Sequence, residues 1–215
     1  MTKPQDISLV DSLDQLTAIN GEPSQSTQLK ILTELDDHAR NFVNRSPFLL
    51  MGTGAQGSGD VSPRGDEPGF VKVLDETTLL IPERPGNRIA DTLRNILNNP
   101  AVGILMLIPG MDDTLRVNGD AYISDEKSYL EMLVHKGKPP KLSIVIDVKE
   151  VYFHCPKAFI RSSLWDPESQ MPREQFPTLG KILIEQIRGR EATPDEVAAV
   201  DAGLESDIQN NLYHS

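Results

Sequence analysis

Residues 101–123, AVGILMLIPGMDDTLRVNGDAYI, decide the fold. The first part, residues 101–108, is almost wholly apolar, which suits a strand that is buried on both faces. Pro109 and Gly110 end this strand. From Leu115 to Ile123 apolar and polar residues alternate, and this period of two predicts a second strand with one face in the core.

Similar patterns on both sides extend the sheet. Strands are expected over residues 47–53, 60–64, 77–81 and 142–153. Helices are expected over residues 29–43, 89–97 and 125–134. About six strands result, mostly joined as hairpins, and the alternation of strand and helix that a parallel sheet needs is missing. The sequence therefore predicts a mainly β protein with helices (α+β), built on an antiparallel barrel.

The two ends of the chain are predicted to form helices outside this barrel. Residues 1–28 predict an N-terminal helical extension, residues 29–190 the barrel domain, and residues 191–215 a C-terminal amphipathic helix. The last helix has the clearest start, because Thr193, Pro194 and Glu196 supply a cap, a first-turn proline and a capping-box glutamate. An apolar stripe follows and is expected to pack on the barrel or on a second subunit: Val197, Val200, Leu204, Ile208 and Leu212.

The amino-acid composition limits the classes of function and the location that are expected for this chain. The 215 residues carry a formal net charge of −11, which disfavours nucleic-acid binding. No apolar run approaches the roughly 20 residues of a membrane-spanning helix. The first residues lack the features of a secretory signal, so a cytoplasmic location is expected. The lone Cys155 has no neighbours at zinc-ligand spacing, and no metal is expected.

The first candidate site is residues 81–89, IPERPGNRI. A helix that begins near Asn87 would leave unpaired backbone N–H groups, and Arg84 and Arg88 would place two guanidinium groups beside them. This arrangement suits a phosphate group. The alternative is that both arginines form surface ion pairs with Glu83 and Asp91.

Three further segments carry polar side chains that suit a ligand. Residues 60–66, DVSPRGD, place small polar residues and an arginine at a strand end, although the same residues also make an ordinary turn. Arg116 and Asn118 lie on the polar face of a strand. Residues 157–165 repeat a cation or tryptophan every four positions, which suits an anionic aromatic ligand or, with nothing bound, stacking of Arg161 on Trp165. Hydrolase and metalloenzyme motifs are not found.

These segments together resemble the pyridoxamine 5'-phosphate oxidase-like flavoproteins, and specifically a bacterial subgroup of FMN-dependent enzymes. The likeness runs from Leu29 to Ile187. Its most specific pieces are residues 61–66 (VSPRGD), 81–88 (IPERPGNR), 115–119 (LRVNG) and 154–158 (HCPKA), with Arg161, Ser162 and Trp165. The resemblance implies a six-stranded split barrel and a homodimer with FMN held at the subunit interface.

The resemblance also implies roles for individual residues. On the phosphate side of FMN it places Arg84, Asn87 and Arg88. Beside the isoalloxazine ring it places Ser62, Pro63, Arg64 and Gly65. The side chains that close the pocket, from the same or the other subunit, are Arg116, Lys157, Arg161, Ser162 and Trp165.

Two departures limit what the resemblance implies. The phosphate signature on successive strands and the C-terminal Arg-x-His motif of true pyridoxamine phosphate oxidases are missing, which argues against vitamin B6 oxidation. The function expected is an FMN-dependent oxidoreductase of undefined substrate, with a nicotinamide as one candidate electron donor and no catalytic residue assigned. The alternatives are a non-catalytic module that binds or senses a flavin, a deazaflavin or heme, and an interaction protein whose site has decayed.

Overall fold

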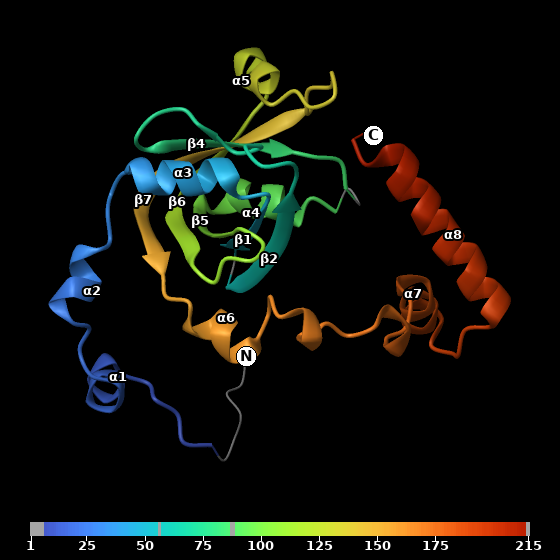
Figure 1. Cartoon of the computed structure of the whole chain (residues 1–215), viewed down its shortest axis with the longest axis horizontal. Helices are drawn as coiled ribbons and strands as arrows, with labels where there is room; N and C mark the ends of the chain where they lie inside the picture. Colours follow the sequence, from blue (N-terminus) through green and yellow to red (C-terminus); the bar gives the residue numbers. More distant parts are fainter. Residues whose placement is uncertain (1–6, 56, 87–88, 214–215) are drawn as a thin grey trace.

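A computed structural model describes residues 7–55, 57–86 and 89–213. Its described residues form one antiparallel sheet of seven strands in the order β2-β1-β5-β6-β7-β4-β3, the split-barrel architecture of an α+β protein (Figure 1). The strands are β1 (Phe48–Ala55), β2 (Ser58–Gly65), β3 (Lys72–Val73), β4 (Thr78–Glu83), β5 (Ala101–Leu107), β6 (Thr114–Ser124) and β7 (Leu142–His154). The predicted class is confirmed, and six of the seven strands match the predicted segments.

The strand that the sequence did not predict is β3. It has two residues, Lys72 and Val73, which pair with Leu80 and Leu79 of β4. Two residues are too few to show a periodic pattern, so the predicted count of six strands was one short.

The two strands β5 and β6 differ in how their two faces are buried. In β6, Leu115, Val117 and Ala121 are buried while Arg116 and Tyr122 are exposed, which confirms the predicted alternation. In β5, Val102, Ile104 and Met106 are buried, but the residues between them are only half-buried. The prediction that β5 is buried on both faces was therefore wrong, because only one of its faces is fully covered.

A β-bulge between Asn118 and Gly119 bends β6 against β7. At Gly119 a Cβ atom would overlap the carbonyl oxygen of Asp147 on β7. Glycine is thus required at this position for the close approach of the two strands, and the bend helps to curl the sheet into a barrel.

Helix α3 (Asp37–Arg45) covers one end of the barrel and contributes Ala39, Phe42 and Val43 to the core. It begins where the side chain of Asp36 accepts a 2.7 Å hydrogen bond from the backbone N–H of Ala39. The predicted helix over residues 29–43 was wrong in its first half. There the backbone of Leu32 pairs with that of Val151 on β7, so the chain adds to the sheet before α3 starts.

Helix α4 (Asp91–Asn98) connects β4 to β5 and buries Thr92 and Ile96. A short helix, α5 (Lys127–Met132), connects β6 to β7. Both were predicted. Helix α4 begins at Asp91 rather than near Asn87, and residues 87 and 88 lie outside the described part of the chain.

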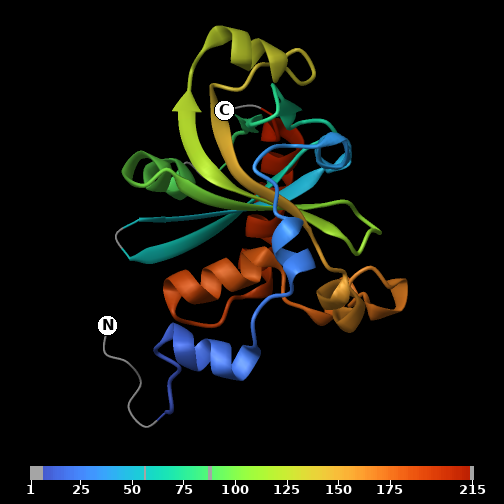
Figure 2. The same cartoon turned by 90° about the vertical axis from the view of Figure 1, so that its left-hand side faces the viewer.

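The remaining helices stand outside the barrel (Figures 1 and 2). They are α1 (Leu13–Asn20), α2 (Gln25–Leu29), α6 (Lys157–Ser162), α7 (Leu179–Arg188) and α8 (Pro194–Asn211), with short 3₁₀ turns at Pro167–Ser169 and Arg173–Gln175. Thr193 and Glu196 form the predicted capping box at the start of α8. Helices α7 and α8 pack against each other, and α8 then runs back to the barrel. The division of the chain at residues 28 and 190 stays a prediction.

No helix within residues 7–55, 57–86 and 89–213 has both the length and the apolar character needed to cross a membrane.

Candidate functional site

A cavity of about 1120 Å³ lies where the split barrel is open. This opening, which we call the seam, separates β2 at one edge of the sheet from β4 and β3 at the other. The cavity is bounded by β2, the end of β4, the start of α4, the segment before β7 and the end of α8. The residues that line it are Asp60, Ser62–Gly65, Phe70, Pro82–Gly86, Ile89–Leu93, Lys138–Leu142 and Asn211–Tyr213.

An ion pair between Arg64 and Glu83 crosses the seam. The Nη1 atom of Arg64 lies 2.9 Å from Oε2 and 3.1 Å from Oε1 of Glu83. Only 15% and 20% of the two side chains are exposed. Among the described residues, Nε of Arg64 is buried and has no hydrogen-bond partner, whereas Oε2 of Glu83 is buried against Nη1 of Arg64. The pair therefore leaves one donor of the guanidinium unused.

Burial raises the pKa of Glu83, and the charge and hydrogen bond of Arg64 offset only part of this effect. A carboxylate that must stay charged in this position depends on its guanidinium partner.

A second ion pair crosses the seam next to the first. Nε of Arg84 donates a 2.8 Å hydrogen bond to Oδ2 of Asp66, whose side chain is 1% exposed. The other oxygen, Oδ1, accepts hydrogen bonds from the backbone N–H of Glu67 and, at 3.0 Å, from the hydroxyl of Tyr213. Burial alone would raise the pKa of Asp66, but these hydrogen bonds and the charge of Arg84 outweigh it and hold the pKa below its usual value.

A hydroxyl pair joins the strand to the helix beside the cavity. The Oγ atoms of Ser62 on β2 and Thr92 on α4 lie 2.8 Å apart. Just before α4, Ala90 adopts a left-handed conformation (φ 58°) and provides no side-chain cap. No side chain of the described residues is seen to cap the first N–H groups of α4, which lie at the wall of the cavity.

Charged side chains of both signs are concentrated in the lining of the cavity. Four cationic side chains line the cavity: Arg64, Arg84, Lys138 and Lys141. Three carboxylates accompany them: Asp60, Glu83 and Asp91. Together with Asp66, which pairs with Arg84, the described residues place four carboxylates beside four cations, so the charges around the cavity balance in a chain whose net charge is −11.

The structure brings together five of the residues that the sequence predicted for the site. Ser62, Pro63, Arg64 and Gly65 on β2 and Arg84 after β4 all line the cavity. Asn87 and Arg88 fall outside the described residues. The alternative, a surface pairing of Arg84 with Glu83 or Asp91, is not found among the described residues, because Arg84 pairs with Asp66 and Glu83 pairs with Arg64 across the seam.

The other predicted residues do not line this cavity within the described chain. Arg116 is exposed on β6, where its Nε atom lies 3.3 Å from Oδ1 of Asn118 and its guanidinium covers the ring of Tyr152 at 5.7 Å. Lys157, Arg161 and Ser162 lie on α6. Their contribution from a second subunit, which the family resemblance implies, stays a prediction.

The predicted helical face of Lys157, Arg161 and Trp165 was wrong. Helix α6 ends at Ser162, and Ser163 turns the chain with a left-handed φ of 49°. Trp165 stacks on Phe159, with 5.9 Å between the ring centroids, and donates a hydrogen bond to the carbonyl oxygen of Met111. It thus lies beyond the helix, where the period of four residues no longer applies.

Sequence reasoning missed several parts of the site. Asp66 and Glu83 were noticed only as neighbours of arginines, and Thr92 and Tyr213 were not singled out at all. Tyr213 lies 147 residues from Asp66 along the chain. No local pattern indicates a contact of that separation, although Asp66 directly after β2 and Glu83 at the end of β4 could have been read as arginine partners.

The fold and the cavity define the class: an α+β protein with a split antiparallel barrel and a ligand-sized cavity at its seam. A family model described as pyridoxamine 5'-phosphate oxidase matches residues 35–155, more than half of the chain. The chain belongs to the pyridoxamine 5'-phosphate oxidase family. No curated protein sequence matches it.

Several solved structures are similar in part. HupZ of Group A Streptococcus is 18% identical, with a TM-score of 0.46 over 55% of this chain and 93% of HupZ. General stress protein 26 of Bacillus anthracis is 15% identical, with a TM-score of 0.42 over 53% of this chain and 88% of that chain. An FMN-binding protein of Syntrophomonas wolfei is 16% identical, with a TM-score of 0.43 over 54% of this chain and 84% of that chain.

Proposed function

We propose that this protein binds FMN in the cavity at the seam and acts as an FMN-dependent oxidoreductase. The observation that carries the proposal is that Ser62–Gly65 and Arg84, to which the family resemblance gives contacts with FMN, line one cavity together with the ion pair of Arg64 and Glu83. Polar and charged side chains that converge on a ligand-sized cavity are typical of a cofactor site.

The chemistry of this pair fits the ring of a flavin. The pyrimidine edge of isoalloxazine alternates carbonyl oxygens with an N–H group. The guanidinium of Arg64 would donate to a carbonyl, and the carboxylate of Glu83 would accept from the N–H. Binding would thus use both charged groups at once, and the apolar side chains of Phe70, Ile89 and Leu93 offer surfaces for the ring.

The rest of the lining fits the phosphate of FMN. Arg84 and Lys141 are cations of the cavity wall, and the start of α4 adds backbone N–H groups and the positive end of a helix dipole. Within the described residues the hydrogen bond of Arg84 to Asp66 uses Nε, so its Nη atoms can donate to an anion. The family resemblance adds Asn87 and Arg88 to this side.

The volume of the cavity leaves room for more than the cofactor. At about 1120 Å³ it is slightly larger than typical ligand pockets, which are roughly 300–1,000 Å³. Bound FMN supplies hydride transfer, and the protein supplies position and hydrogen bonds. Space beside the ring is therefore proposed to take the substrate or a nicotinamide donor.

A homodimer is part of the proposal. Large apolar side chains are exposed on the helices outside the barrel, among them Leu13 and Ile19 of α1, Leu29 of α2 and Ile187 of α7, each at least 70% exposed. Surfaces of this kind usually mark an interface. A second subunit that covers them could also bring Arg116 and α6 to the cavity of its partner. Light scattering after gel filtration tests this, with a dimer mass expected.

The decisive experiment is titration of FMN with purified protein, followed by the quenching of flavin fluorescence. One FMN per chain is expected for the natural protein. Arg64→Met should weaken binding by about tenfold or more, because a hydrogen bond from a charged donor is lost. Arg45→Met is the matched control, since Arg45 is an exposed arginine on α3. A natural protein that binds no FMN would remove the proposal.

Reaction with NADH or NADPH without oxygen separates an enzyme from a binding module. Bleaching of the bound flavin at catalytic rates supports the oxidoreductase. An inert chromophore, or heme or deazaflavin identified by mass after heat release, supports the non-catalytic alternative instead.

A further inference from the structure

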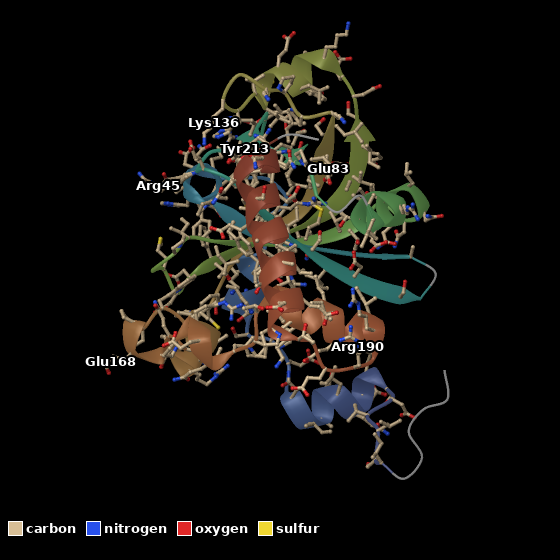
Figure 3. All side chains as sticks on the ribbon, turned by 90° about the vertical axis from the view of Figure 1, so that its right-hand side faces the viewer. Arg45, Glu83, Lys136, Glu168, Arg190 and Tyr213 are labelled. Carbon is tan, nitrogen blue, oxygen red and sulfur yellow. The ribbon has the colours of Figure 1, made fainter. Side chains whose placement is uncertain are left out.

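Helix α8 is attached to the rest of the molecule by its packing on α7 and by contacts at its end. Its 18 residues include no buried side chain. It packs on α7, stands away from the barrel along most of its length and brings its end to the seam (Figures 1 and 3). The last described residues, Asn211, Leu212 and Tyr213, line the cavity. The end of α8 and the two residues after it are thus one wall of a site whose other walls belong to the barrel domain.

Tyr213 makes the contacts that hold this wall in place. Its hydroxyl donates a 3.0 Å hydrogen bond to Oδ1 of Asp66. Its ring lies against that of His135, with 4.5 Å between the centroids. Two cations flank the same ring, with the guanidinium of Arg84 at 5.8 Å and Nζ of Lys136 at 5.2 Å. Figure 3 shows Tyr213 at the end of α8, close to Lys136 and on the side of Glu83.

These contacts join the helix end to the groups that bound the cavity. Asp66, the acceptor for Tyr213, also receives the hydrogen bond of Arg84 across the seam. The neighbouring Leu212 is 56% exposed and Ile208 is 61% exposed, so the apolar stripe of α8 adds little to the attachment at this end. Attachment through one aromatic side chain is weak enough to open and close repeatedly.

We propose that the end of α8 is a gate for the cavity, with Tyr213 as the latch that closes it on Asp66. The proposal rests on FMN binding in the cavity. When the latch is closed, the cofactor cannot pass this wall; when the latch opens, α8 swings on its packing with α7 and the cavity exchanges its ligand with solvent.

A gate has a kinetic signature that a simple binding contact lacks. If a latch closes equally well with and without FMN, its removal speeds both association and dissociation by the same factor and leaves the dissociation constant unchanged. A contact between Tyr213 and FMN would act otherwise, because its loss would speed dissociation and weaken binding. The two rates measured together therefore separate the two roles.

The test uses the full chain and Tyr213→Ala, with stopped-flow quenching of FMN fluorescence for association and dilution for dissociation. Both rates should rise about tenfold, since a hydrogen bond to a carboxylate and a ring contact are lost. Tyr213→Phe should give a smaller rise, because it keeps the ring. Tyr122→Phe is the control, since Tyr122 is exposed on β6 and does not line the cavity.

Hydrogen exchange of α8 gives a readout that needs no cofactor. In Tyr213→Ala the amides of the last turns of α8 should exchange faster than in the natural protein, while those of β6 stay unchanged. Equal exchange in the two proteins, or a rise in the dissociation rate alone, overturns the gate. If the natural protein shows a protected helix end but quenches no FMN, the failure lies with the proposed cofactor, and the gate for FMN fails with it.

Discussion

Arg84 and Asp66 close the split barrel where backbone hydrogen bonds do not. Nε of Arg84, directly after β4, donates a 2.8 Å hydrogen bond to Oδ2 of Asp66, directly after β2. Strand β2 forms one edge of the sheet, and β4 lies next to the other edge strand, β3. Next to this contact, the ion pair of Arg64 on β2 with Glu83 at the end of β4 joins the same two strands. Charged side chains thus hold the two edges together and at the same time furnish the wall of the cavity.

We expect Asp66→Asn to lower the free energy of unfolding by about 2 kcal/mol, because the change leaves a largely buried guanidinium without its charge partner. The figure is below that of a fully buried pair, since Arg84 keeps 18% of its side chain exposed. Urea unfolding at pH 7 measures it. Glu76→Gln is the control, because Glu76 pairs with Arg40 on the open surface and 62% of its side chain is exposed. Equal effects of the two changes would show that the seam pair contributes no more than a surface pair.

The pH dependence of stability should reveal the same carboxylate. The pKa of Asp66 is lowered in the folded state, so the unfolded chain binds the proton more readily. The stabilisation is complete above the ordinary aspartate pKa of about 4 and is lost as the pH falls below it through the folded pKa. Urea midpoints at pH 7, 5, 4 and 3 should therefore converge for the natural protein and Asp66→Asn towards acid.

Glu83 contributes with the opposite sign. Its pKa is raised by burial, so the folded state binds the proton more readily, and this group favours folding as the pH falls. The comparison between the natural protein and Asp66→Asn isolates Asp66, because Glu83 is present in both. A constant difference between their midpoints over the whole pH range would contradict the assignment.

The fold was largely predictable because its main strands carry local signals. The alternation of Leu115, Val117 and Ala121 needs only the sequence of β6 itself, and the start of α8 is marked by Thr193 and Glu196 within four residues. The apolar residues at 29–35 misled the helix prediction because Leu32 adds to the edge of β7 rather than to a helix. That choice is made by a strand more than a hundred residues away.

The site was predictable only in part, for the same reason. Ser62 to Gly65 were predicted from the family resemblance, supported by small polar residues at a strand end, and Arg84 was predicted from its place before an expected helix start. Their pairing was not found, since it depends on which strands form the two edges of the sheet. The contact of Tyr213 with Asp66 requires both the closing of the barrel and the return of α8, and neither is encoded near these residues.

The glycine at the bulge gives a prediction about the shape of the barrel. Gly119→Ala should destabilise the protein by about 3 kcal/mol, because a Cβ atom would overlap the backbone of β7 and the strands would have to move apart. Gly59→Ala is the matched control in β2, where nothing lies within 4 Å of the new Cβ atom. Urea unfolding compares the two, and a tolerated alanine at position 119 would mean that the bulge can relax without loss.

The capping box of α8 should control how well the C-terminal helix is formed. The side chain of Thr193 accepts the N–H of Glu196, and the carboxylate of Glu196 accepts the N–H of Thr193 while also pairing with Arg188 and Arg190. Thr193→Ala removes the cap and should cost the helix about 1 kcal/mol, which corresponds to roughly fivefold faster hydrogen exchange in its first turns.

This loss should stay local. Because α8 buries none of its side chains, the barrel does not depend on it, and the urea midpoint of the whole protein should hardly change. Ser206→Ala provides a control in the middle of the same helix, where no cap is lost. If exchange in the first turns is the same for Thr193→Ala and the natural protein, the helix is held by its packing on α7, for which the 2.9 Å hydrogen bond from the backbone N–H of Gly180 to Asp201 is the strongest described candidate. In that case Asp201→Ala, rather than the loss of the cap, should free the helix.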